Sequence, residues 1–262
     1  MAPYYLLTAG CNSFPGTPGH DLRGCIADAH RMHATLTKAF GEPVRYRILE
    51  DPTRAEFVQA LQTALAMAQD GEVEEVLFSV STHGTVVSAN DPENSCTALV
   101  FSDATPNGWG LLIDWQLKSI LDGFPVGCRV EGWFDSCHSG TISRGIADHP
   151  RPRSIPASVF APLQRERIRK GGNIHTRSLT SPDGLGSNMA FWGACLDAEE
   201  SADAPDGAGG FCGAFTRAWC DEFEWNANTS RFRLLPLVAK ALARSGFVNQ
   251  HPTLSAQRSG GA

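Results

Sequence analysis

The stretch VEGWFDSCHSG, residues 130–140, begins as an apolar run and ends in a polar segment that contains a cysteine. Its first part, Val130–Phe134, is rich in β-branched and aromatic residues, which is typical of a buried strand. The stretch VLFSVSTHG, residues 76–84, has the same design and places His83 after a second apolar run. Reacting groups of open parallel sheets collect at the carboxyl ends of their strands. The two stretches therefore predict a sheet that brings Cys137 and His83 to one crevice.

The rest of the chain alternates between apolar strand patterns and helical patterns. Further buried strands are predicted at Tyr4–Ala9, Val44–Leu49 and Met189–Cys195. A helix is predicted after Thr53, which forms a capping box with Glu56 three residues later. The other helical patterns cover Asp28–Phe40, Asp114–Leu121, Gly213–Phe223 and Leu234–Arg244. This alternation, with strands that are almost continuously apolar, predicts a mostly parallel sheet covered by helices on both faces.

The bulk composition limits the classes of protein. A chain of 262 residues with 42% hydrophobic and 19% charged residues fits one folded domain and excludes a mostly disordered chain. The net charge of −6 argues against a nucleic-acid partner held by a basic face. The start of the chain lacks a charged n-region, and no apolar run is long enough to span a membrane. The eight cysteines show no zinc spacing, so we expect free thiols and a cytoplasmic location.

A cysteine and a histidine at one sheet edge can perform nucleophilic catalysis. The thiolate attacks, while the imidazole favours its formation and returns a proton to the leaving group. The backbone N–H groups of Gly84 and Cys137 would form the oxyanion hole, since glycine lets the backbone approach closely. The alternative is that Cys137 is an inert buried thiol and that His83-Gly84 occurs by chance.

Six motifs in order carry a resemblance to metacaspases. Asp135-Ser136-Cys137-His138-Ser139-Gly140-Thr141 resembles their nucleophile segment, and Ser81-Thr82-His83-Gly84-Thr85 is similar to their histidine segment. The other motifs are Gly10-Cys11-Asn12 with Leu22–Ala29, Cys195-Leu196-Asp197 with Glu200–Asp203, Gly213–Thr216, and Gln250–Leu254. The resemblance implies a caspase-like three-layer α/β/α sandwich with a six-stranded, mainly parallel sheet. It also implies a cysteine endopeptidase that cuts peptide bonds after Arg or Lys, so the expected partner is a protein or peptide substrate.

The resemblance places the primary specificity pocket at Cys25, Asp28, Ser81 and Asp135. Two carboxylates in one partly buried pocket repel each other unless a cation enters, so the pocket should select a basic side chain. Arginine can engage a carboxylate through two parallel hydrogen bonds, so we expect Arg to be preferred over Lys. Asp28 has a second interpretation, as an acid favoured by the dipole at a helix N-terminus.

The resemblance also predicts how the domain 1–262 is divided. A large catalytic part covers 1–145, a linker loop covers 146–187, and a small catalytic part covers 188–262. The linker carries a basic cluster that consists of Arg165, Arg167, Arg169 and Lys170. An enzyme that selects basic residues could cut itself within 151–172, because an exposed loop is what proteolysis requires. The alternatives are a merely solvated linker and activation by an upstream protein or protease.

The chain departs from the metacaspase pattern at two places. Thr82 replaces a glycine before the histidine, and its side chain is expected to narrow the backbone near the substrate carbonyl. The positions that match the family's calcium ligands are Cys96, Asp114, Trp115 and Arg144. Calcium needs about 6–8 oxygen ligands, so no calcium site is expected at these positions. No other metal site and no cofactor are expected either. Asp91, Glu93 and Asp103 could form a different calcium site, but a solvated acidic loop is the favoured interpretation. The competing function is a catalytically silent caspase-fold regulatory or scaffold protein, and a metal-dependent hydrolase lacks any ligand spacing.

Overall fold

A six-stranded sheet forms the centre of the molecule in the computed structural model, which describes residues 2–87, 96–137, 150–160, 188–196 and 199–256. The strand order is β12-β9-β7-β3-β1-β2. The strands are β1 (Tyr4–Gly10), β2 (Arg45–Glu50), β3 (Glu75–Ser81), β7 (Arg129–Asp135), β9 (Met189–Gly193) and β12 (Thr253–Ala256). All neighbours pair in parallel except β12, which is antiparallel to β9. The predicted mainly parallel sheet is confirmed.

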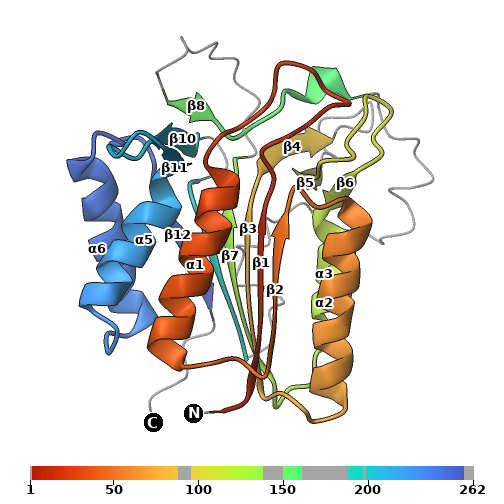
Figure 1. Cartoon of the computed structure of the whole chain (residues 1–262), viewed down its shortest axis with the longest axis vertical. Coiled ribbons are helices and arrows are strands. Elements are labelled where there is room, and N and C mark those ends of the chain that lie inside the picture. The colour runs from red at the N-terminus through yellow and green to blue at the C-terminus, as the bar shows by residue number, and fades with distance from the viewer. Residues whose placement is uncertain (1, 88–95, 138–149, 161–187, 197–198, 257–262) are drawn as a thin grey trace.

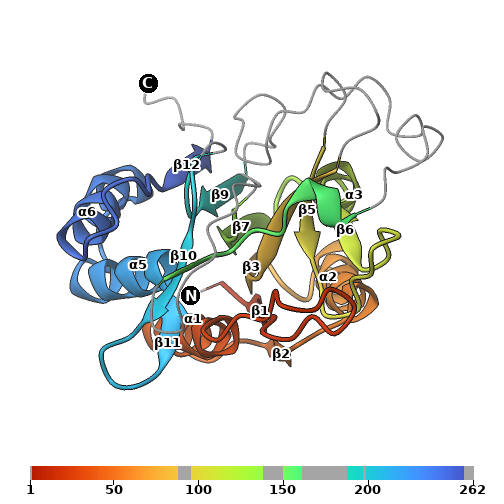
Figure 2. The ribbon, with the colours of Figure 1, turned by 90° about the horizontal axis from the view of Figure 1, so that it is seen from above.

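Helices cover both faces of this sheet (Figures 1 and 2). One face carries α1 (Cys25–Phe40), α5 (Ala214–Trp225) and α6 (Arg231–Arg244), and the other carries α2 (Arg54–Gln69) and α3 (Asp114–Leu121). Successive side chains of a strand point to opposite faces. In β1, accordingly, Tyr4 and Leu6 join the apolar cluster under α1, α5 and α6, whereas Tyr5 and Leu7 join the cluster under α2 and α3. The three-layer α/β/α sandwich follows from this double burial.

Two details of the sequence prediction can be checked in these layers. The capping box of α2 is present, since Thr53 and Glu56 bond each other's backbone N–H groups. The prediction of a buried strand near Val44–Leu49 is wrong in one respect: β2 lies at the sheet edge and exposes Arg45, Tyr46 and Arg47.

Two small sheets lie at the carboxyl ends of the parallel strands, at the top of Figure 1. One consists of β4 (His83–Val87), β5 (Cys96–Val100) and β6 (Leu111–Ile113), in the order β4-β5-β6. The other has the order β11-β10-β8 and consists of β8 (Arg151–Pro152), β10 (Ala202–Pro205) and β11 (Phe211–Gly213). A short 3-10 helix, η2 (Ala157–Val159), follows β8. The sequence predicted neither sheet, and it assigned residues 150–160 to a loop.

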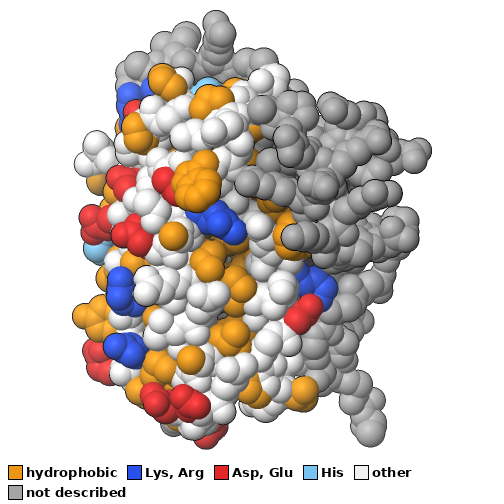
Figure 3. Space-filling view, turned by 90° about the vertical axis from the view of Figure 1, so that its right-hand side faces the viewer, with side chains coloured by type: hydrophobic (Ala, Val, Ile, Leu, Met, Phe, Trp, Pro, Cys, Tyr) orange, Lys and Arg blue, Asp and Glu red, His pale blue; other side chains and the backbone are white. Residues whose placement is uncertain are grey.

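The surface carries charges of both signs, and the cysteines are unpaired. On the face shown in Figure 3, acidic and basic side chains are interspersed among hydrophobic ones. All eight cysteines are free thiols, as predicted, and all except Cys195 are buried. Among the described residues, no helix is both long and apolar enough to cross a membrane.

Candidate active site

The central strands bring the cysteine and the histidine segments together. β3 and β7 are neighbours, and Ser81 is the register partner of Asp135. Cys137 follows β7 by two residues, and His83 begins β4 immediately after the turn at Thr82. The two segments therefore end side by side at the carboxyl edge of the sheet, as the sequence predicted.

The predicted oxyanion donors converge on one oxygen atom. The backbone N–H groups of Gly84 and Cys137 donate to the carbonyl oxygen of Arg153 at 2.9 and 3.1 Å. Two N–H donors at about this distance from a carbonyl oxygen are the geometry that stabilises a developing oxyanion. The chain thus holds one of its own peptide carbonyls at the two predicted oxyanion donors.

The ring of His83 is buried and held in one orientation. Its Nε2 lies 2.5 Å from the carbonyl oxygen of His20, and since a carbonyl only accepts, Nε2 carries the proton. The ring packs against Phe14 at 4.9 Å between centroids. Burial lowers the pKa of His83 to about 4, so the imidazole is neutral at neutral pH. Its Nδ1 is buried and has no hydrogen-bond partner among the described residues, which leaves this nitrogen as the proton acceptor.

The thiol of Cys137 contacts the backbone of Ser201. Its Sγ lies 3.2 Å from the carbonyl oxygen of Ser201 and also accepts the Ser201 N–H. Hydrogen bonding with Cys137 raises the pKa of the neighbouring Cys195 thiol, and burial adds to this. None of the hydrogen bonds of Cys137 within the described residues goes to His83. The structure therefore shows both groups at the site without a direct bond between them.

A fully buried guanidinium fills the predicted specificity pocket. Nη2 of Arg153 lies 2.7 Å from Asp28 Oδ2 and 3.0 Å from Asp203 Oδ1, and Nη1 lies 3.2 Å from Asp135 Oδ2. The pocket therefore has three carboxylates where the sequence predicted two. One buried cation shared by three acids leaves excess negative charge, which requires further hydrogen bonds to each acid.

Backbone and hydroxyl donors supply these hydrogen bonds. Asp28 accepts the N–H of Gly213 at 2.9 Å, and Asp203 accepts the N–H of Gly24 at 3.0 Å. Asp135 accepts two hydroxyls, Ser201 Oγ at 2.6 Å and Thr216 Oγ1 at 2.7 Å. These donors hold the acids in place for a cation.

The pocket also shifts the pKa of Asp28 and leaves no room for a side chain at position 213. The pKa of Asp28 is raised to about 7, chiefly by burial; the charge of Arg153 lowers this pKa, and the charge of Asp135 raises it. A Cβ at Gly213 would lie 2.1 Å from Asp135 Oδ2 and 2.6 Å from Arg153 Nη1. Only glycine therefore leaves room for the guanidinium at this position.

The other predicted pocket residues play smaller parts. Cys25 is buried, and burial raises the pKa of its thiol while the charge of Arg153 lowers it. Ser81 accepts the N–H of Cys11 through its carbonyl and makes no hydrogen bond to Arg153 among the described residues. The side chain of Thr82 is buried, and its hydroxyl donates to the carbonyl of Val100 at 2.5 Å, in β5.

Sequence reasoning missed several residues of the site. Asp203 belongs to the motif 200–203, which could have marked it, and the contact of His20 with His83 had no sequence signal. Arg153 was not among the predicted basic residues of the linker. The missed residues are Arg153, Asp203, Ser201, Gly213, Thr216 and His20. The predicted cluster Arg165, Arg167, Arg169 and Lys170 lies outside the described residues.

The segment around Arg153 lies across the top of the sheet as an extended strand, drawn green in Figure 2. Before Arg153, Pro152 is the register partner of Ala202, and the Arg153 N–H donates to Ser201 O at 3.0 Å. After it, the N–H of Ile155 donates to Gly84 O at 2.9 Å. The segment is therefore bonded to β10 on one side of Arg153 and to β4 on the other.

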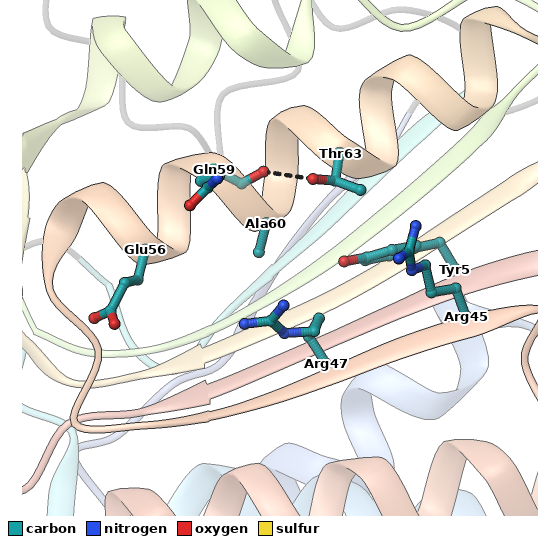
Figure 4. A pocket seen from close by; sticks show the side chains of 7 residues that line it. All are labelled: Tyr5, Arg45, Arg47, Glu56, Gln59, Ala60 and Thr63. Carbon is teal, nitrogen blue, oxygen red and sulfur yellow. Dashed lines mark hydrogen bonds between the residues drawn. The ribbon is translucent and has the colours of Figure 1, made fainter.

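The remaining polar features lie elsewhere. A separate pocket between α2 and the strands β1 and β2 is lined by Tyr5, Arg45, Arg47, Glu56, Gln59, Ala60 and Thr63 (Figure 4). Asp114, at a position that matches a calcium ligand of metacaspases, accepts the N–H groups of Thr97 and Trp115. Asp103 accepts the N–H of Arg54, and Asp91, Glu93 and Arg144 lie outside the described residues. Within the described ranges, no three His, Cys, Asp or Glu residues group as metal ligands.

Comparisons with known proteins agree with this arrangement. The caspase domain family model matches residues 5–260. Metacaspase-7 of Arabidopsis thaliana is 30% identical over 174 residues, which cover 62% of this chain and 40% of that protein. Metacaspase-1 of Yarrowia lipolytica is 28% identical over 295 residues, covering 95% of this chain and 60% of that protein. The chain therefore spans less than two thirds of either relative.

Solved structures show the same fold. A crystal structure of a Geobacter sulfurreducens protein has a TM-score of 0.67 at 24% identity and covers 98% of this chain and 95% of its own. Caspase-1 from Spodoptera frugiperda has a TM-score of 0.63 at 13% identity and covers 97% of this chain and 86% of its own. At these identities the likeness shows the caspase fold alone, which confirms the predicted fold class.

Proposed function

The chain belongs to the caspase domain family, and from this membership we propose that it is a cysteine endopeptidase that cuts after arginine and, less readily, after lysine. Cys137 is the nucleophile and His83 is the base. This function needs no calcium. Among the positions that match the calcium ligands of metacaspases, only Asp114 offers a carboxylate. The proposed division is a large part at 1–145, a linker at 146–187 and a small part at 188–262.

The placement of Arg153 carries this proposal. Its guanidinium lies among Asp28, Asp135 and Asp203, while its carbonyl oxygen accepts both oxyanion donors. A residue whose side chain fills the specificity pocket and whose carbonyl fills the oxyanion hole occupies the position of the residue that is cut. This chain fills that position with an arginine.

The pocket chemistry explains the order of preference. A guanidinium presents several donors in a fixed plane and can bond more than one carboxylate, as Arg153 does, whereas an ammonium is a single point charge. An aspartate would add a fourth negative charge to a buried site, which is strongly unfavourable. We therefore expect arginine first, lysine second and aspartate not at all.

The proposed reaction uses the two nitrogens of His83 differently. Nε2–H remains bonded to the carbonyl of His20, while Nδ1 takes the thiol proton of Cys137. The thiolate attacks the carbonyl carbon, and the N–H groups of Gly84 and Cys137 hold the oxyanion. The C–N bond breaks as Nδ1–H protonates the leaving amine, which gives a thioester. Water then attacks the thioester, its proton passes to Nδ1, and release of the acid restores the thiol.

The same geometry supports self-processing within the predicted region 151–172. The bond between Arg153 and Ser154 is the one held at the oxyanion donors. We propose that this bond is cut first and that the cut frees the pocket for protein substrates. An upstream protease that cuts the same linker would have the same effect. The competing function, a silent scaffold, is favoured only by the fact that Arg153 blocks the pocket in the uncut chain.

A panel of peptides that differ only at the cut residue tests the specificity. Citrulline has the shape of arginine without its charge, so its peptide should be cut at least about 100-fold more slowly, because three buried acids lose their cation. The lysine peptide should be intermediate, and the aspartate peptide should not be cut. The rates are measured as kcat/KM by fluorescence, with calcium and with a chelator. Equal rates for arginine and citrulline would contradict the role of the carboxylates.

The pH dependence should follow Asp28 rather than His83. Asp28 must be ionised to attract a guanidinium, and burial raises its pKa to about 7 even with Arg153 bound. In the empty pocket the cation that lowers this pKa is gone, so kcat/KM for the arginine peptide should fall as the pH drops through about 7 or slightly above. His83, whose pKa is about 4, stays neutral over this range. A profile that stays flat down to pH 5 would mean that Asp28 is ionised throughout and would contradict the assignment.

A further inference from the structure

The segment that follows Arg153 is also hydrogen-bonded to β4. Gly84 and Ser154 form a parallel bridge, and the N–H of Ile155 donates to the carbonyl of Gly84 at 2.9 Å. The carbonyl of Ile155 in turn accepts the hydroxyl of Thr85 at 2.7 Å. Both backbone polar groups of Ile155 are therefore satisfied by the first residues of β4.

The side chain of Ile155 is completely buried, at 0% exposure. It belongs to the large apolar cluster under α2 and α3, together with Val87 of β4 and Phe160 at the end of η2. Pro156, the next residue, is only half-buried. Ser154 is also buried, at 6% exposure, so burial extends from the arginine to Ile155, whose side chain is the first aliphatic one after the arginine.

β4 offers this binding to any extended chain. It is an outer strand of the sheet β4-β5-β6, so its free side must be satisfied by another strand or by water. Thr85 is itself completely buried, and its hydroxyl points to the carbonyl of the segment that lies beside it. The carbonyl of Gly84 and the hydroxyl of Thr85 bind only the backbone of the residue in the place of Ile155. The apolar cluster contacts the side chain of that residue.

Resting on the proposed function, we propose that the site has a second specificity subsite beyond the cut bond, an apolar subsite that binds an aliphatic side chain two residues after the arginine. Thr85 and Gly84 hold the backbone of that residue, and Ile155 occupies the subsite in the uncut chain. Natural substrates would then share an aliphatic residue two positions after the arginine. After the Arg153–Ser154 bond is cut, the segment that begins at Ser154 leaves and the subsite becomes open to substrate.

Internally quenched peptides test the subsite directly. The peptides carry the sequence of residues 150–156 and differ only at the position of Ile155, with isoleucine, valine, glycine or aspartate. The enzyme is the full chain after its self-processing is complete. We expect kcat/KM to be similar for isoleucine and valine, about tenfold lower for glycine, because the burial of the side chain is lost, and about 100-fold lower for aspartate, because its charge would be buried without a partner.

Each outcome separates the subsite from the proposed function. If all four peptides are cut at the same rate, the subsite is absent or stays filled by the segment that begins at Ser154, and the inference is overturned while arginine specificity stands. If no arginine peptide is cut, including a fluorogenic peptide that ends at its arginine, the proposed function itself fails.

A threonine variant provides a second test. Thr85→Val keeps the shape of the side chain and removes the hydroxyl, so kcat/KM for the isoleucine peptide should fall roughly tenfold, mainly through KM. The matched control is Thr63→Val, on α2 outside the site, which should leave this rate unchanged. If Thr85→Val lowers the cleavage of a peptide that ends at its arginine by the same factor, Thr85 acts on the whole site rather than on the subsite, and this part of the inference is wrong.

Discussion

Cys137→Ala should lower kcat/KM for arginine peptides by at least about 10⁴-fold, because it removes the only nucleophile that the proposed reaction uses. The remaining oxyanion donors and carboxylate pocket should still bind the peptide, so its affinity should change little. The same variant should remain a single chain during long incubation at high protein concentration. Peptide hydrolysis and intact-mass measurement check both results.

A matched cysteine variant separates the loss of the nucleophile from an effect on folding. Cys128 is also a buried thiol, and it lies just before β7, away from the site. Cys128→Ala should keep both peptide hydrolysis and self-processing. If Cys137→Ala retained more than about 1% of the wild-type rate, another group would be the nucleophile and the proposed mechanism would be wrong.

Arg153→Gln should abolish the cut between residues 153 and 154. Glutamine is shorter and neutral, so it cannot satisfy Asp28, Asp135 and Asp203 together. Intact-mass measurement of the incubated protein should show no fragment that ends at residue 153. The matched control is Arg151→Gln, since the half-buried Arg151 donates to the carbonyl of Asp21 and not to the pocket. This control should be cut as the wild type is.

The loss of Arg153 should also destabilise the uncut chain. At neutral pH three buried acids lose their cation, which should lower the free energy of unfolding by about 3–5 kcal/mol. The deficit should shrink as the pH falls, because protonation removes the uncompensated charge, first from Asp28, whose pKa is already raised. Fragments that end at Arg165, Arg167, Arg169 or Lys170 in wild type as well as in Arg153→Gln would instead assign self-processing to the basic cluster.

The large sheet and its helices were predicted from the sequence because each element carries its own local pattern. Apolar runs of five or six residues marked β1, β3 and β7, and the capping box at Thr53 marked the start of α2. The strands of the sheet β11-β10-β8 carry no such pattern. β8 has only two residues, one of them Pro152, and it becomes a strand because Ala202 lies beside it. Such pairing depends on the whole fold and not on local sequence.

The site was predicted where motifs carried it and missed where distant contacts made it. The motifs named Cys137, His83 and two of the pocket acids. Asp203 enters the pocket because Gly24, 179 residues earlier, donates to its carboxylate. In the sequence alone, Arg153 is one more basic residue of a predicted loop. Only the folded chain places its guanidinium among the pocket acids. The motif 200–203 could have marked Asp203, but no local pattern encodes the pairing of Arg153 with these acids.

In the proposed function, the two sheet edges that flank the Arg153–Ser154 bond would act as a conformational filter on target proteins. From Pro152 to Ile155, the bound chain is fully stretched between β10 and β4. An arginine in a helix or a tight turn cannot present its backbone in this way without local unfolding, which costs free energy for every residue that must be rearranged. Folded targets would therefore be nicked at loose connecting segments and spared in their ordered elements, so that a target is divided into large pieces rather than degraded.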